Sequence, residues 1–77
     1  MNVFYDPKAD ALDVVFRKGK VAHTRKIGRE MYLDVDSKGE PLSLEILDAR
    51  ARFSTADLKN LSFNVTTYPP TTGHTTV

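Results

Sequence analysis

Short stretches in which apolar and polar residues alternate recur along most of the chain. Alternation with a period of two is typical of strands that bury one face. Turn-forming segments such as "RKGK" and "DSKGE" separate these stretches, and Gly39 in the second segment predicts a type I turn closed by a left-handed residue. The pattern predicts five strands, over residues 2–5, 11–17, 21–27, 30–36 and 41–48.

The periodicity changes in the segment "RFSTADLKNL". Ser54 is a candidate N-cap with Asp57 three residues later, and Phe53 and Leu58 have the spacing of a hydrophobic staple. These features predict a short helix over residues 55–61, which must pack on the sheet because it is too short to be stable alone. The predicted fold class is therefore α+β: an antiparallel meander of about five strands, followed by one short helix packed on it.

The same patterns divide the chain into a single ββββ(β)α domain over residues 1–62 and a Thr/Pro-rich tail over residues 63–77. We expect the tail to be flexible and at least partly disordered, because it offers little apolar area to offset the cost of ordering. Phe63, Val65 and Tyr68 leave open a further strand. Within the sheet, Leu33, Leu44 and Ile46 are predicted to form the inner face, against Leu58.

Composition narrows the chemistry of this 77-residue chain. It has no cysteine, and its two histidines, His23 and His74, lie far apart, so we expect no disulfide, no metal site and no cofactor. No signal peptide or membrane span is recognisable, which predicts a cytoplasmic protein that does not enter membranes. A formal net charge of +1 gives no indication of nucleic-acid binding.

Three aspartates crowd the segment "YDPKADALDVVF" and raise the question of a catalytic or metal-binding site. Asp6 precedes Pro7, so it is held extended and its carboxylate can accept amide protons just after the proline, as in an Asx turn. Asp10 is predicted to be a second local cap, and Asp13 to point to the solvated face, opposite Leu12 and Val14. Turn chemistry thus explains these residues without catalysis.

The segments "VFYDPKADALDVVF", "KVAHTRKIG" and "MYLDVDSKGEPLSLEILDARARF" together resemble the small bacterial family known as domain of unknown function 2283. The resemblance covers about residues 3–53, although His23 stands where the family usually has an acidic residue. No biochemical activity is established for the family. Because its members are often encoded beside small toxin-like proteins, the resemblance implies an antitoxin-like role and a toxin-like protein partner.

Large apolar residues at outward strand positions predict a protein interface. Alternation assigns four of them to the face that the helix leaves uncovered: Tyr5, Val15, Tyr32 and Leu47. A two-fold mate would shield such a patch, so we expect a homodimer formed by this face or by an edge strand. The alternative is a set of scattered surface residues.

Basic residues suggest a second function, nucleic-acid binding by a β-ribbon, if the second and third strands form a hairpin. The candidate contacts are Arg17, Lys18, Lys20, Arg25, Lys26 and Arg29. Acidic residues nearby favour instead a solvated edge that resists strand addition.

Candidate catalytic groups are few, and a hydrolase that uses Asp34 and Glu45 ranks last, because no nucleophile or base accompanies them. His23 likewise has no partner at a useful spacing. The first hypothesis is therefore a non-enzymatic interaction module that binds a small protein. A nucleic-acid-binding regulator is the alternative.

Overall fold

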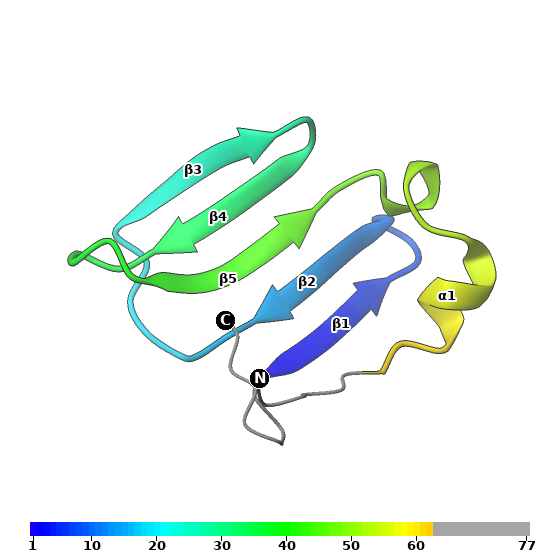
Figure 1. Ribbon diagram of the computed structural model, residues 1–77, viewed down its shortest axis with the longest axis horizontal. Helices are drawn as coiled ribbons and strands as arrows, with labels where there is room; N and C mark the ends of the chain where they lie inside the picture. The colour runs from blue at the N-terminus through cyan, green and yellow to red at the C-terminus, as the bar shows by residue number, and fades with distance from the viewer. Residues whose placement is uncertain (63–77) are drawn as a thin grey trace, which may run out of the picture.

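Five antiparallel strands and one short helix make up the fold (Figure 1). The structure is a computed structural model, and it describes residues 1–62. The predicted α+β class is confirmed, whereas the predicted tail and its possible further strand lie outside the described residues. The elements are β1 (Asn2–Asp6), β2 (Ala11–Val15), β3 (His23–Gly28), β4 (Met31–Val35), β5 (Pro41–Ile46), a 3-10 turn (Ala49–Ala51) and α1 (Thr55–Lys59).

The strands are ordered β1-β2-β5-β4-β3, so the sheet contains a crossover that a sequential meander lacks. The β4–β5 hairpin lies between β2 and β3, and residues 16–22 pass its end to reach the edge strand β3 (Figure 1). The Phe16 amide donates to the Leu42 carbonyl and the Ala22 amide to the Val35 carbonyl, both at 2.8 Å. A hairpin of the second and third strands, the basis of the nucleic-acid hypothesis, is therefore wrong.

One buried cluster lies under α1 at one end of the sheet, and Val35 and Leu42 are buried toward the other end. Leu12, Ile46, Ala49 and Leu58 form a buried cluster, and partly buried residues pack around it: Val3, Tyr5, Met31 and Leu44. Burial of one large aliphatic side chain contributes about 1.5–3 kcal/mol, which holds a helix too short to persist alone. We call the face under α1 the covered face. Leu44 and Ile46 lie on it as predicted.

The ends of α1 show how far local signals predict a helix. Ser54 is the N-cap, and its hydroxyl accepts the Asp57 amide proton at 3.1 Å, which confirms the predicted start. The helix ends at Lys59 rather than at residue 61. Phe53 lies outside the core cluster and is 37% exposed.

Among the described residues, no helix has the length and apolar character needed to cross a membrane.

Candidate functional site

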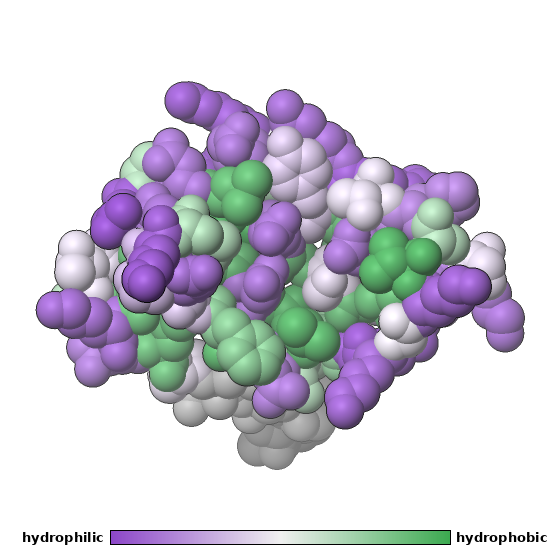
Figure 2. Space-filling view, turned by 180° about the vertical axis from the view of Figure 1, so that it is seen from behind, coloured by the Kyte–Doolittle hydropathy of each residue, from purple (hydrophilic) through white to green (hydrophobic). Residues whose placement is uncertain are grey.

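The face of the sheet opposite α1 carries two rows of side chains that run across the strands; we call it the uncovered face (Figure 2). Directly paired residues point to the same side, so the register defines each row. The first row is Phe4, Asp13, Glu45, Tyr32 and Lys26. The second row is Asn2, Val15, Ser43, Asp34 and Thr24. Apolar and polar side chains are interspersed on this face (Figure 2).

Three carboxylates, Asp13, Asp34 and Glu45, occupy the middle of these rows and form what we call the acidic group. Asp13 lies directly opposite Glu45, and Asp34 is in the neighbouring row. Burial raises the pKa of Asp13, and the Asp34 charge adds to this. The pKa of Glu45 is also raised, first by burial and then by the charges of Asp13 and Asp34. Ionisation of Asp13 and Glu45 is therefore disfavoured, first by burial and then by neighbouring carboxylate charges.

Hydrogen bonds relieve only one member of the acidic group. Asp34 accepts from the Thr24 hydroxyl and, at 3.2 Å, from the Ser43 hydroxyl. The carboxylates of Asp13 and Glu45 accept no hydrogen bond from residues 1–62. Asp13 does point away from Leu12 and Val14 as predicted, but it is half-buried rather than fully solvated, because its row packs on both sides of it.

The predicted interface residues divide between the two faces. Val15, Tyr32 and Leu47 lie on the uncovered face, where Leu47 continues β5 and its amide donates to the Glu30 carbonyl at 2.9 Å. Tyr5 lies on the covered face, opposite Leu12, and packs against the core. Its assignment to the uncovered face is wrong, because β1 carries apolar residues on both faces and alternation alone cannot orient it.

Phe4 is the interface candidate that the sequence reasoning missed. It is 56% exposed, and it lies on the uncovered face opposite Asp13 and diagonal to Val15. Phe4 alternates with Val3 and Tyr5, so the orientation of β1 that puts these two on the covered face puts Phe4 on the uncovered face. The apolar residues therefore form two pairs, Phe4 with Val15 and Tyr32 with Leu47, on either side of the acidic group.

The corner aspartate Asp6 has a structural role. Its Oδ1 accepts the amide protons of Lys8 at 2.9 Å and Ala9 at 3.3 Å, which confirms the Asx turn expected from "DPKAD". The carboxylate thus satisfies backbone donors of the loop that follows β1.

Asp10 joins distant parts of the chain, and its predicted role as a local cap is wrong. Its backbone is left-handed, with φ of +53°. The carboxylate accepts the Tyr5 hydroxyl at 2.7 Å and the Arg50 amide at 3.1 Å, and it lies 3.4 Å from Arg50 Nε. The hydrogen bond from Tyr5 is the main cause that lowers the pKa of Asp10, and the same bond raises the pKa of Tyr5. Asp10 therefore fixes the β1–β2 corner to the 3-10 turn.

The six basic residues proposed to contact nucleic acid do not form one stripe. Arg17 pairs with Asp36 at 2.6 Å, and Lys18 and Lys20 are exposed on the linker between β2 and β3. Arg25 and Lys26 lie on the edge strand β3 and point to opposite faces, since they pair with Leu33 and Tyr32. Arg29 follows in the β3–β4 turn.

The fold also places the residues of the two catalytic alternatives. Asp34 and Glu45 lie on one face, as members of the acidic group, and His23 is exposed at the start of β3. Within residues 1–62, no group of three or more histidine, aspartate or glutamate side chains is arranged to hold a metal ion.

These features define a small α+β domain with a helix on one side of a five-stranded sheet. A family model described as "Protein of unknown function (DUF2283)" matches residues 2–50. That range is more than half of the 77 residues, and the chain belongs to this family. The comparisons with curated proteins and with solved structures found no match.

Proposed function

We propose that this protein is a non-enzymatic binding module that holds a basic partner protein on its uncovered face. The observation that supports this most is the half-buried acidic group between two apolar pairs. No described element covers this face, and Phe4 is 56% exposed on it. Aromatic side chains around a partly desolvated polar centre are typical of protein interfaces.

The raised pKa values indicate which charge the partner brings. Ionised Asp13 and Glu45 are destabilised by burial and by neighbouring carboxylate charges, and a lysine or arginine placed between them would offset both effects. Hydrogen bonds from such a cation to a carboxylate are stronger than those between neutral groups. The apolar pairs then supply contact area that the partner removes from water.

The same charge argues for a different protein rather than a second copy. A two-fold mate that used this face would set its own acidic group against this one, and opposed like charges disfavour association. The homodimer through this face stays a prediction. Repulsion between the two acidic groups makes a second copy a less favourable occupant of the face than a basic protein. The family resemblance adds that a small toxin-like protein is the partner class to test first.

A charge-reversal experiment tests the proposal. Tagged full-length chain, as wild type, Glu45→Lys and Glu40→Lys, is used to capture proteins from extract of the native cells, and the retained proteins are identified by mass spectrometry. Glu40 is the matched control, because it lies exposed in the β4–β5 turn, away from the acidic group. Glu45→Lys relieves repulsion with Asp13, so it is expected to fold normally.

The expected result is one basic protein that wild type and Glu40→Lys retain and that Glu45→Lys loses. The purified pair should also dissociate as salt is raised, because surface charge contacts are screened. Equal retention by Glu45→Lys and wild type contradicts the proposal, and so does a retained partner with an acidic surface.

A further inference from the structure

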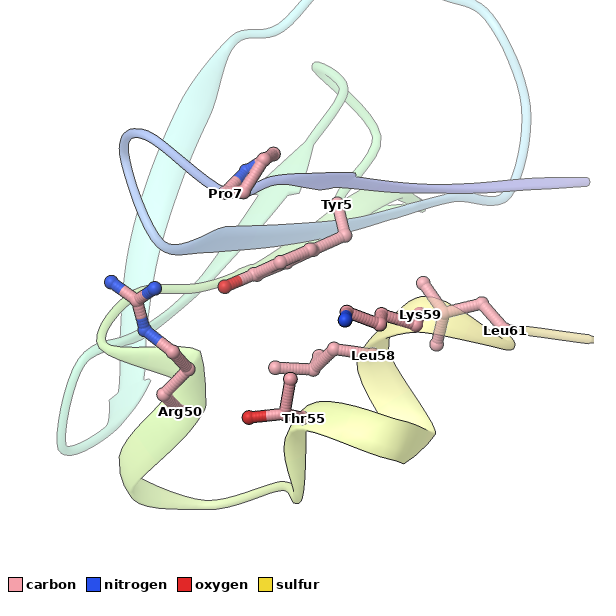
Figure 3. A pocket seen from close by; sticks show the side chains of 7 residues that line it. All are labelled: Tyr5, Pro7, Arg50, Thr55, Leu58, Lys59 and Leu61. Atoms are coloured by element: carbon pink, nitrogen blue, oxygen red, sulfur yellow. The ribbon is translucent and has the colours of Figure 1, made fainter.

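A cavity of about 490 Å³ lies between the edge strand β1 and the helix α1, away from the uncovered face (Figure 3). Tyr5 and Pro7 contribute from the β1 side, and Leu58, Lys59 and Leu61 from the helix and the residues after it. In Figure 3 the ring of Tyr5 lies beneath its strand with the hydroxyl on the side of Arg50, and Leu58 faces the ring from the helix. The volume is within the usual range of ligand pockets.

The lining of this cavity is apolar with a positive rim. Tyr5, Leu58 and Leu61 supply the apolar surface, and Arg50 and Lys59 supply two cations. No carboxylate is among the described residues that line it. The carboxylate of Asp10 nearby already accepts a hydrogen bond from the Tyr5 hydroxyl, and Nε of Arg50 lies 3.4 Å from it. The cavity therefore suits an apolar group that ends in a negative charge.

The outer edge of β1 adjoins the cavity and offers backbone hydrogen bonds. β1 is the last strand of the sheet on this side, and no strand among the described residues pairs with its outer edge. In an antiparallel ladder, hydrogen-bonded residue pairs alternate with pairs that are not hydrogen-bonded. Phe16 and Leu42 form a hydrogen-bonded pair, so the register makes Val3–Val14 and Tyr5–Leu12 pairs that are not hydrogen-bonded. By this pattern the N–H and C=O groups of Val3 and Tyr5 point away from β2.

The two edges of the sheet differ in how they resist strand addition. β3 carries Arg25 and Lys26, which block an incoming strand by charge. β1 contains no lysine or arginine within Asn2–Asp6. A strand that pairs with β1 would run beside α1, with alternate side chains directed at the cavity.

We propose that the groove between β1 and α1 binds the C-terminal end of a partner polypeptide. The extended partner adds to the edge of β1 through Val3 and Tyr5. Its apolar last side chain enters the cavity against Leu58, and its carboxylate lies near Lys59 and Arg50. Main-chain bonds give affinity in this mode of recognition, and the pocket gives specificity. The inference goes beyond the proposed function, and because it uses a different surface it succeeds or fails independently.

Peptide binding to the full-length chain tests this inference. The probes are fluorescein-labelled pentapeptides of alternating threonine and valine that end in leucine, phenylalanine or aspartate. Each is made with a free carboxylate and with a C-terminal amide, and binding is followed by fluorescence polarisation. The proteins are wild type, Lys59→Gln and the control Lys38→Gln, which removes an exposed lysine in the distant β4–β5 turn. Melting temperatures establish that the variants are folded.

The apolar peptides with a free carboxylate should bind wild type and Lys38→Gln, and their amides should bind about tenfold more weakly, which corresponds to about 1.4 kcal/mol. Lys59→Gln should bind carboxylate and amide alike. The aspartate-ended peptides should not bind. In amide hydrogen exchange, Val3 and Tyr5 should become protected by the bound peptide.

Four results overturn the inference. They are no binding by any apolar peptide, equal binding of carboxylate and amide by wild type, protection confined to the uncovered face, and displacement of the peptide by octanoate at an affinity equal to its own. The last result identifies a site for small amphiphiles rather than for a chain end.

Discussion

The carboxylates at the turns and the carboxylates on the uncovered face have the same chemistry in opposite environments. Asp6, Asp10 and Asp36 each accept hydrogen bonds from backbone amides or from tyrosine or arginine side chains. Asp13 and Glu45 face each other and accept none from the described residues. Residue type does not distinguish the turn carboxylates from those on the uncovered face, but their hydrogen-bond partners do. The satisfied carboxylates hold the fold together, and we propose that the unsatisfied pair is where a cation from a partner protein binds.

The pKa directions state the same contrast. Hydrogen bonds, from Tyr5 to Asp10 and from Arg17 to Asp36, are the first cause that lowers these two pKa values. Such groups stabilise the fold above their ordinary pKa, and the contribution is lost as pH falls through the lowered value. Asp13 and Glu45 have raised pKa values, so their ionisation destabilises the fold. Their effect is absent in acid and develops as pH rises through the raised values.

Asp10→Ala should show the largest effect, because it removes the acceptor of the Tyr5 hydroxyl and of the Arg50 amide at once. We expect a lower melting temperature than for any other single carboxylate variant, measured by circular dichroism. The matched substitution Asp13→Ala, only three residues along the chain, should leave the melting temperature near that of wild type. Similar losses for the two variants would remove the distinction between turn and face.

Asp6→Ala should have an intermediate effect. It removes a carboxylate that accepts two local amide protons, and the loss of a comparable capping acceptor costs about 0.5–2 kcal/mol. Urea unfolding measures this change, and capture of the partner by the folded variant should be unchanged. Loss of partner capture at unchanged stability would show that Asp6 is a functional carboxylate after all.

The double variant Asp13→Asn, Glu45→Gln should change stability in the opposite direction, making the protein more stable. Like charges directly opposite in a sheet destabilise by about 0.2–1 kcal/mol, so the variant should be more stable than wild type by that amount at neutral pH. The difference should shrink as pH falls through the carboxyl range, because wild type then becomes protonated too. An unfolding series in urea from neutral to acidic pH measures it. A variant that is less stable at neutral pH would mean that the acidic group is satisfied in the native chain.

Local signals predict the strands, the β1–β2 and β4–β5 turns and the start of the helix, because alternation, Asp6, Gly39 and Ser54 act within a few residues. Strand order depends on contacts far apart in sequence, and no local pattern reports that β2 pairs with β5. The same limit explains Asp10, whose partner Arg50 is 40 residues away. Alternation brings together only Asp34 and Glu45, across the β4–β5 hairpin, because Asp13 joins them through the β2–β5 pairing, which no local pattern predicts.

The smallest effect on stability is expected at Phe4, an exposed aromatic residue on the uncovered face. Phe4→Thr keeps a residue that favours strands, and the side chain is 56% exposed, so unfolding in urea should change by no more than about 0.5 kcal/mol. Partner capture should nevertheless fall, because the apolar pair beside Asp13 is lost. Val3→Thr is the matched control, since the neighbouring Val3 lies on the covered face and packs against the core, and it should lose stability.

Sedimentation of wild type and Phe4→Thr at micromolar concentration completes the test. If wild type sediments as a dimer, and Phe4→Thr is both monomeric and clearly less stable, then the face is occupied by a second copy. In that case the acidic group must be neutralised within the homodimer, and the proposal of a basic partner on this face is wrong.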